Sequence, residues 1–431
     1  MRLWAVFAIW LTLSYGVALA TEEYSFDLSE IEKKPLHIGG YVEFSPVLFG
    51  LDTNSALYKV NLYDRDKENI REEYNFSALL DGSYKKGTTE FRAIVNTNLG
   101  KSYLGWSEET TLYEGYMSSR PSSTFNFNIG KKTLKWGTGY AWNPVAFLDR
   151  PKDPYDPELA REGFVVASAD YIRSFVGPLK TFSFTPVLMP VYDHINDDFG
   201  KINRLNFAGK TYFLLYDTDI DLLFLTGGSK TNRYGMDFSR NITSNFEIHG
   251  ELAFINDYKK RYINSDGTVF NNEYDATSYL LGLRYLTESD TTYIFEFFHD
   301  ATGFAENEMT DYFSFIDQGY DAYLASGDDS LLKRASNVAE GSYNRRNPMR
   351  DYLYLRASQK EPFDILYFTP SLTGIFNVDD ESFSIGPELL YTGIKNLELR
   401  LRTTFLVGDS YAEFGEKQND YRAELRVRYY F

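Results

Sequence analysis

The chain has 431 residues, with 44 Lys and Arg against 61 Asp and Glu, 17% aromatic residues and no cysteine. Its hydrophobic share is 43% but its mean hydropathy is −0.38, which excludes a bundle of membrane helices, since each would need about 20 consecutive apolar residues. The lack of cysteine excludes disulfide scaffolds and cysteine-ligated metals, and the net charge of −17 argues against a nucleic-acid partner, which requires a basic face.

The first twenty residues have the pattern of a secretory signal peptide. Arg2 gives a positive start, residues 3–15 are apolar, and Ala18-Leu19-Ala20 has the small residues of a cleavage site. We therefore expect residues 1–20 to be removed. Residues 21–36 would then form a short periplasmic segment, too short for a plug domain. The alternative, an uncleaved membrane anchor, fits the cleavage pattern less well.

From residue 37 onward, apolar and polar residues alternate with the period of two that is typical of β-strands. Short and long connections tend to alternate as well, as they do in outer-membrane barrels with an even number of strands. The sequence therefore predicts an all-β fold, a transmembrane antiparallel β-barrel of about 18 strands with long external loops, over residues 37–431. The expected strands are 37–49, 73–86, 88–100, 108–119, 124–133, 163–176, 180–191, 206–217, 219–228, 231–242, 244–258, 275–287, 291–303, 350–361, 365–378, 382–394, 396–407 and 420–431.

The connection 134–162 combines glycines, aromatic residues, basic residues and three prolines. Prolines stiffen a loop and glycines permit tight turns, and flat aromatic faces next to positive charges suit a passage for solutes. We interpret 134–162 as a loop that folds into the barrel and narrows it, the alternative being an exposed external loop. The residues expected to form this constriction are Trp136, Tyr140, Trp142, Arg150, Lys152 and Arg161.

The connection 304–349 contains apolar residues with the spacing of a helix. In 304–349, Phe313, Ile316 and Tyr320 have helical spacing, which predicts a short surface helix, with an irregular aromatic loop as the alternative.

At the expected outer ends of strands, histidines lie next to acids, an arrangement that could activate water in a hydrolase on the barrel rim. We give this hypothesis little weight, because ordinary rim residues explain the same pattern. These residues are Asp193, His194, His299 and Asp300.

The last two strands show the alternation best. If Leu401 and Leu425 face lipid, the arginines between the apolar residues face the lumen. Guanidinium groups match carboxylates, phosphates and sulfates, so these residues could favour anions; the alternative is an Arg–Glu network that only stiffens the wall. The residues expected to line the pore and set its selectivity are Arg92, Arg284, Arg356, Glu398, Arg400, Arg402, Arg422, Glu424, Arg426 and Arg428.

Two motifs resemble known families. The end Arg428-Tyr429-Tyr430-Phe431 is similar to the C-terminal signature that outer-membrane proteins present to the barrel-assembly machinery, with Phe431 as the assembly signal. The stretch Gly130 to Gly139, followed by Asn143-Pro144, is similar to the "G-[KRQ]…W-G" and "N-P" segment of several large porins. With its 18 segments, the chain resembles the monomeric eighteen-stranded porin-like channels, the group that contains carboxylate-specific and alginate-export-type porins.

The resemblance implies a bacterial outer-membrane protein in contact with lipid and lipopolysaccharide. We expect a passive channel for small solutes, anionic or sugar-like, with no reaction, no cofactor and no metal. The alternatives are a pore that exports a polysaccharide, a structural barrel with an occluded lumen, and the rim hydrolase described above.

Overall fold

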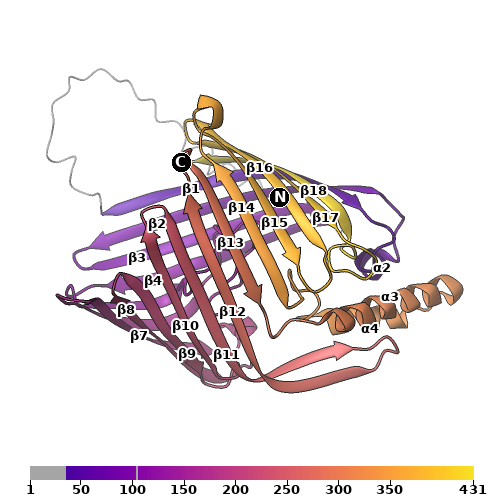
Figure 1. Cartoon of the computed structure of the whole chain (residues 1–431), viewed down its shortest axis with the longest axis horizontal. Helices are drawn as coiled ribbons and strands as arrows, with labels where there is room; N and C mark the ends of the chain where they lie inside the picture. Colours follow the sequence, from indigo (N-terminus) through magenta and orange to yellow (C-terminus); the bar gives the residue numbers. More distant parts are fainter. Residues whose placement is uncertain (1–34, 103–104) are drawn as a thin grey trace, which may run out of the picture. The chain divides into compact units, whose positions relative to one another are not determined.

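The computed structural model describes residues 35–102 and 105–431, so the expected signal peptide and nearly all of the expected periplasmic segment lie outside the described residues. The strands in this part of the chain form one antiparallel sheet of 18 strands, in which neighbours in sequence pair with each other (Figure 1). The strands are β1 (Leu36–Leu51), β2 (Ile70–Lys86), β3 (Thr89–Ser102), β4 (Gly105–Ser119), β5 (Phe125–Lys132), β6 (Phe164–Ser174), β7 (Leu179–Val191), β8 (Arg204–Leu215), β9 (Thr218–Thr226), β10 (Arg233–Thr243), β11 (Phe246–Ile263), β12 (Val269–Leu286), β13 (Thr291–His299), β14 (Asp351–Gln359), β15 (Phe368–Asn377), β16 (Phe383–Ile394), β17 (Leu397–Val407) and β18 (Asn419–Tyr430).

The first and last strands close the sheet into a barrel. β1 and β18 are antiparallel partners, with Phe44 opposite Val427 and Tyr41 opposite Tyr430. Closure removes the two free edge strands that an open sheet would have, which is the condition for a sheet to cross a bilayer. The predicted 18-stranded barrel is therefore confirmed.

The two faces of the wall differ as the alternation predicts. On β17 and β18, Leu401 and Leu425 point outward and are 43% and 44% exposed, whereas Arg402 and Arg426 point inward and are almost fully buried. The lumen therefore holds the charged residues of these strands and the outer surface is apolar. Among the described residues, no helix is both long enough and apolar enough to cross a membrane.

Short turns join the strands at one end of the barrel, here called the turn end, and the longest connections lie at the other, the loop end. Between β2 and β3 only Gly87 and Thr88 form the turn. Gly87 has a φ of 59°, a value that glycine adopts without a steric penalty and that two-residue hairpin turns often require.

The loop end carries three helices: α2 (Ala56–Leu62), α3 (Glu306–Ser326) and α4 (Ser330–Ala339). The helix expected in 304–349 is present as α3 and is followed by a second one, α4. The seven-residue helix α2 was not expected; it begins at Ser55, whose side chain accepts a hydrogen bond from the backbone N–H of Tyr58, a typical N-cap interaction.

The segment 259–274, expected to be a long loop, is mostly strand. β11 and β12 continue to Ile263 and Val269, beyond the other hairpins, and α3 and α4 pack against β11 (Figure 1). Stacking of Tyr262 on Phe270, with ring centroids 5.3 Å apart, supports the extension. Because this hairpin lies beyond the lipid region, its sequence lacks the strict alternation that identified the other strands.

The orientation of the wall gives a stability prediction. Leu425→Arg places a guanidinium group in hydrocarbon near the middle of β18, so we expect the free energy of unfolding in lipid vesicles to fall by about 2–4 kcal/mol. Tyr429→Arg lies on the same face near the turn end and should cost only about 0–1 kcal/mol. Equal losses for both variants, measured by denaturant titration, would contradict the orientation.

Candidate channel and its internal loop

The segment 133–163 between β5 and β6, here called the internal loop, lies against the lumen face of the opposite wall. Glu251 of β11 is 3% exposed and binds the loop with both carboxylate oxygens. Its Oε1 accepts hydrogen bonds from the backbone N–H groups of Thr138 and Gly139 (both 2.7 Å) and from Asn143 Nδ2 (2.8 Å), and its Oε2 accepts one from Val145 N (3.2 Å). One wall carboxylate thus binds four residues of the loop, within the span 138–145.

Glu296 of β13 makes a second attachment. Its side chain is fully buried and accepts hydrogen bonds from the backbone N–H groups of Tyr140 and Ala141, the latter at 2.8 Å. His249 Nε2 lies 2.9 Å from the same carboxylate. Together the two glutamates accept six hydrogen bonds from the loop, so they hold its backbone in place.

Polar contacts within the loop complete its shape. Asp149 accepts hydrogen bonds from three successive backbone N–H groups, 134 to 136, at 2.9 to 3.0 Å. Lys152 Nζ donates to the carbonyl oxygens of Gly139 (2.5 Å) and Tyr140 (3.2 Å). Lys152 was expected to face solutes, and the structure shows that it also braces the loop.

The other two basic residues of the loop also have partners. Arg150 pairs with Glu162 (2.8 Å) and with Asp198 (2.6 Å), so its charge is compensated. Arg161 Nη1 donates to the carbonyl oxygen of Arg150 at 2.5 Å and makes no ion pair within residues 35–102 and 105–431. Of these two, only Arg161 retains an uncompensated charge.

The tryptophans anchor the loop to the barrel wall and present little free ring surface. Trp142 is 8% exposed and stacks on Phe298 of β13, with ring centroids 5.2 Å apart. Trp136 is 3% exposed and belongs to an apolar cluster on the β6–β11 side. Tyr140 is half-buried, 6.0 Å from the Tyr354 ring. The expectation that Trp142 offers a flat face to solutes is wrong, because its ring is covered by the wall.

Asp156, in the second half of the internal loop, attaches the loop to β17 and β18. Arg426 Nη1 lies 2.9 Å from its carboxylate, and Arg400 and Arg402 lie 3.6 Å from it. Burial by itself would raise the pKa of Asp156, but the charges of the three arginines hold it below the usual value. A single loop carboxylate is therefore bound by two strands that are far from it in the sequence.

The remaining expected arginines of this wall are also paired. Arg402 donates to Glu388 through Nε (2.7 Å) and Nη2 (2.5 Å), and Arg428 binds Glu43 at 2.6 Å. Six arginines thus face five carboxylates in one network, here called the arginine wall. Its members are Glu43, Asp156, Arg356, Glu388, Glu398, Arg400, Arg402, Arg422, Glu424, Arg426 and Arg428.

The two other predicted pore-lining arginines lie elsewhere on the wall. Arg92 of β3 pairs with Asp81 at 2.7 Å. Arg284 of β12 is in register with Glu247 of β11, and it makes no ion pair among the described residues.

A cavity, here called the passage, lies between the internal loop and strands β1–β5. It has a volume of about 760 Å³, with five cationic side chains against three carboxylates. Lys132 lies over the Tyr116 ring, 4.7 Å from its centroid. The charged lining residues are Asp81, Arg92, Glu114, Lys132, Lys135, Lys152, Glu158 and Arg161.

Four residues that hold the loop or line the passage were not among the expected site residues. Glu251, Glu296 and Asp156 hold the loop, and Lys132 faces the passage. Alternation places Glu251 and Glu296 on the lumen face, since each lies between outward apolar neighbours, but no local signal identifies their partners. Lys132 precedes the Trp136-Gly137 motif and could have been included with the loop.

The expected rim residues lie at the β7–β8 and β13–β14 connections. His194 Nε2 lies 3.4 Å from Asp193, and with Asp197 these residues form an exposed cluster on the β7–β8 connection. His299 instead pairs with Asp351 (2.7 Å), and Asp300 pairs with Arg345 (3.3 Å). Of the two expected pairs, Asp193 and His194 are therefore together, whereas His299 and Asp300 each have another partner.

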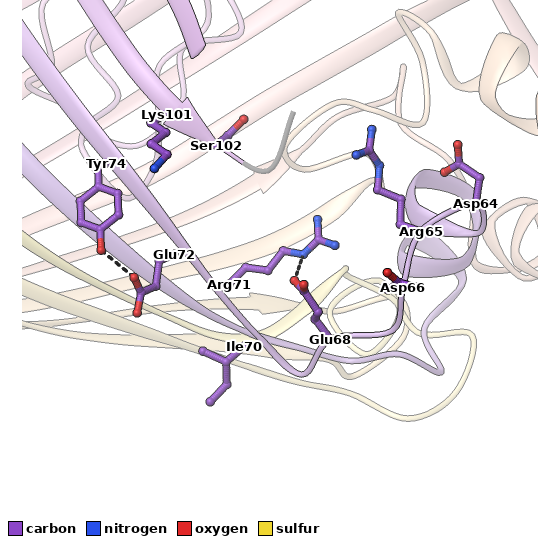
Figure 2. Close-up of a pocket in the computed structure, with 10 residues that line it drawn as sticks. All are labelled: Asp64, Arg65, Asp66, Glu68, Ile70, Arg71, Glu72, Tyr74, Lys101 and Ser102. Atoms are coloured by element: carbon purple, nitrogen blue, oxygen red, sulfur yellow. Dashed lines mark hydrogen bonds and ion pairs between the residues drawn. The ribbon is translucent and has the colours of Figure 1, made fainter. Parts of the chain in front are cut away.

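A second cavity, of about 870 Å³, lies where the chain enters β2. Figure 2 shows side chains of both signs around it, with Glu68 bound by Arg71 (3.0 Å) and Glu72 by the hydroxyl of Tyr74 (2.6 Å). Its lining has four carboxylates against three cationic side chains, so the excess charge is negative, whereas that of the passage is positive.

Comparisons with known proteins support the architecture. No protein-family model matches the chain, and no curated protein matches it. Among solved structures it is similar to a BenF-like porin from Pseudomonas fluorescens Pf-5, with a TM-score of 0.53 and 10% identity over 92% of this chain and 98% of that one. It is also similar to OccK5 (OpdH) of Pseudomonas aeruginosa, with a TM-score of 0.51 and 13% identity over 91% and 98% of the two chains.

At these identities the likeness shows the fold. The barrel has the architecture of bacterial outer-membrane porins, and the predicted resemblance to the eighteen-stranded group is confirmed at that level. A location in the outer membrane agrees with this architecture and with the apolar outer face.

The attachment of the internal loop can be tested by removing its acceptors. Glu251→Ala together with Glu296→Ala deletes the carboxylates that bind the loop backbone, so we expect a larger and more fluctuating single-channel current in planar bilayers. Asp219→Ala is the control, because Asp219 faces the lumen but binds Tyr212 instead of the loop. Unchanged current in a correctly inserted double variant would show that the loop is held by its apolar contacts.

The Asp156 attachment gives a pH prediction. Since the arginines lower the pKa of Asp156 in the folded state, the attachment is complete above the unfolded value of about 3.9 and is lost as the pH falls through the lower folded value. The Asp156 attachment itself should therefore persist from neutral pH to about pH 4, and the change in conductance that comes from its loss should appear only below that pH. Asp156→Asn should show the altered conductance at neutral pH, whereas Asp197→Asn on an exposed loop should not.

Proposed function

We propose that the chain forms an outer-membrane channel for the passive passage of small solutes, and that anions pass more readily than cations. The observation that carries the proposal is the passage of about 760 Å³ between the internal loop and β1–β5, with its excess of two positive charges. No chemical reaction and no cofactor is part of this function.

Most positively charged side chains of the passage are not neutralised by a carboxylate, so their charge can act on solutes. Lys132, Lys152 and Arg161 make no ion pairs in the described part of the chain, whereas Arg92 is compensated by Asp81. Acids in the external loops act over only about 8 Å at physiological salt, so they do not cancel a charge inside a narrow passage. Charges that line the passage therefore govern selectivity more than the net charge of −17 does.

The proposal assigns selectivity to Lys132 and to two expected loop residues, Lys152 and Arg161, instead of to the arginine wall. The arginine wall is nearly neutral as a whole, and Arg402 and Arg426 are almost fully buried. Its members therefore serve to hold Asp156, while the passage lies beside β1–β5.

Size favours small solutes over a polymer chain. The internal loop is attached on one side to β11 and β13 and on the other to β17 and β18, so it crosses the lumen. Sugar-like solutes fit the same passage, because the tyrosines Tyr41, Tyr113 and Tyr116 line it and combine flat rings with hydroxyl groups.

Ion selectivity is tested by the reversal potential across a salt gradient. The wild-type channel should prefer anions, and Lys132→Gln with Arg161→Gln should lower that preference because it removes two uncompensated charges. Lys259→Gln is the control, since Lys259 lies on the exposed part of β11 and pairs with Glu273. A wild-type channel that prefers cations would refute the assignment, and a barrel that inserts without conducting would refute the channel itself.

A further inference from the structure

A groove indents the lipid-facing surface near the turn end, over strands β1–β5. It has a volume of about 560 Å³ and is lined almost wholly by apolar atoms. Its floor consists of small residues on three adjacent strands, Gly82, Ala93 and Gly115. Register places Ala93 opposite both Gly82 and Gly115, so the three residues form one continuous depression.

The rims of the groove are large apolar side chains that stand out from the wall. Ile38, Phe91 and Met117 are 60%, 50% and 36% exposed, and all three line the groove. Ile38 and Phe91 lie close to the turn-end limits of β1 and β3. The groove is therefore apolar enough to hold hydrocarbon, and its rim reaches the turn end of β1 and β3.

Two exposed cations lie at the turn end beside this groove. Lys86 ends β2, and Arg120 follows β4; neither makes an ion pair among the described residues. The backbone N–H of Arg120 donates to the carbonyl oxygen of Thr88 at 2.8 Å, which brings the two turns together. The segments 85–88 and 120–124 contain no acidic residue.

We propose that this groove binds one acyl chain of an anionic phospholipid from the periplasmic leaflet, with the lipid phosphate paired to Lys86 and Arg120. An arginine can bind a phosphate with two parallel hydrogen bonds, and basic side chains at a membrane surface attract anionic headgroups. The apolar groove alone would accept any lipid, and the two cations select the anionic class.

The inference rests on the membrane location in the proposed function but not on conduction. The experiment therefore measures lipid binding and no current. The full chain, purified in detergent, is mixed with dioleoyl phosphatidylglycerol or with dioleoyl phosphatidylcholine and analysed by native mass spectrometry. We expect one phosphatidylglycerol molecule per chain to be retained, and phosphatidylcholine to be retained about tenfold less.

Gly82→Ile tests the groove itself. A Cβ atom at Gly82 would meet only the carbonyl oxygen of Ala93, at 4.0 Å, so isoleucine fills the groove without a clash in the wall. Gly374→Ile is the matched control: Gly374 lies on β15, away from the groove, and its Cβ atom would likewise meet a single backbone oxygen at 3.9 Å. Only Gly82→Ile should lose the bound lipid, and heat-modifiable migration on gels verifies that both variants form barrels.

The headgroup contact is tested separately. Lys86→Gln with Arg120→Gln should weaken phosphatidylglycerol retention about tenfold, to the level of phosphatidylcholine. Lys180→Gln, at another turn, should have no effect.

Three results would overturn the proposal. The first is equal retention by Gly82→Ile and Gly374→Ile, and the second is retention that does not depend on Lys86 and Arg120. The third is a dimer of the chain that Gly82→Ile dissociates, since the groove would then be a protein interface.

Discussion

A bilayer accepts charged side chains on only one face of a β-barrel wall, and this constraint determines the rest of the structure. An arginine at the midplane on the lipid side costs about 2–4 kcal/mol, so the strands direct their arginines and acids inward. Arg402 and Arg426 are consequently almost fully buried while Leu401 and Leu425 are exposed. The alternation that satisfies the lipid thus concentrates charge in a lumen where water is limited.

Polar and charged side chains that are buried in the lumen need hydrogen-bond or ion-pair partners, and the internal loop supplies several of them. Glu251 and Glu296 are bound by backbone N–H groups of the loop, and the arginine wall receives Asp156. The loop is thereby attached both to β11 and β13 and to β17 and β18, through interactions that each satisfy buried polar groups. Removing one partner of such a buried pair typically costs 3–5 kcal/mol, so the position of the loop and the stability of the wall depend on each other.

The sequence predicted the membrane part of the fold well, because the period of two is a direct consequence of the lipid constraint. Beyond the bilayer the constraint no longer applies. The hairpin of β11 and β12 therefore extends where a loop was expected, and α2, with seven residues, is too short to show a clear helical period. α3, with 21 residues, is long enough for its apolar spacing to be recognised.

The candidate site was less predictable for a related reason. Alternation tells which face a residue occupies but not which residue it meets, and Arg426 meets Asp156 from 270 positions away in the sequence. The arginines of the last strands therefore looked like free selectivity groups, although carboxylates compensate nearly all of their charge. The side chains left without ion-pair partners, such as Lys132 and Arg161, are revealed only when every contact is known. One wall thus supports the internal loop and the opposite wall bounds the passage. In the proposed channel, the charge of the passage is what remains after structural pairing, so neither the net charge nor the number of inward arginines predicts it.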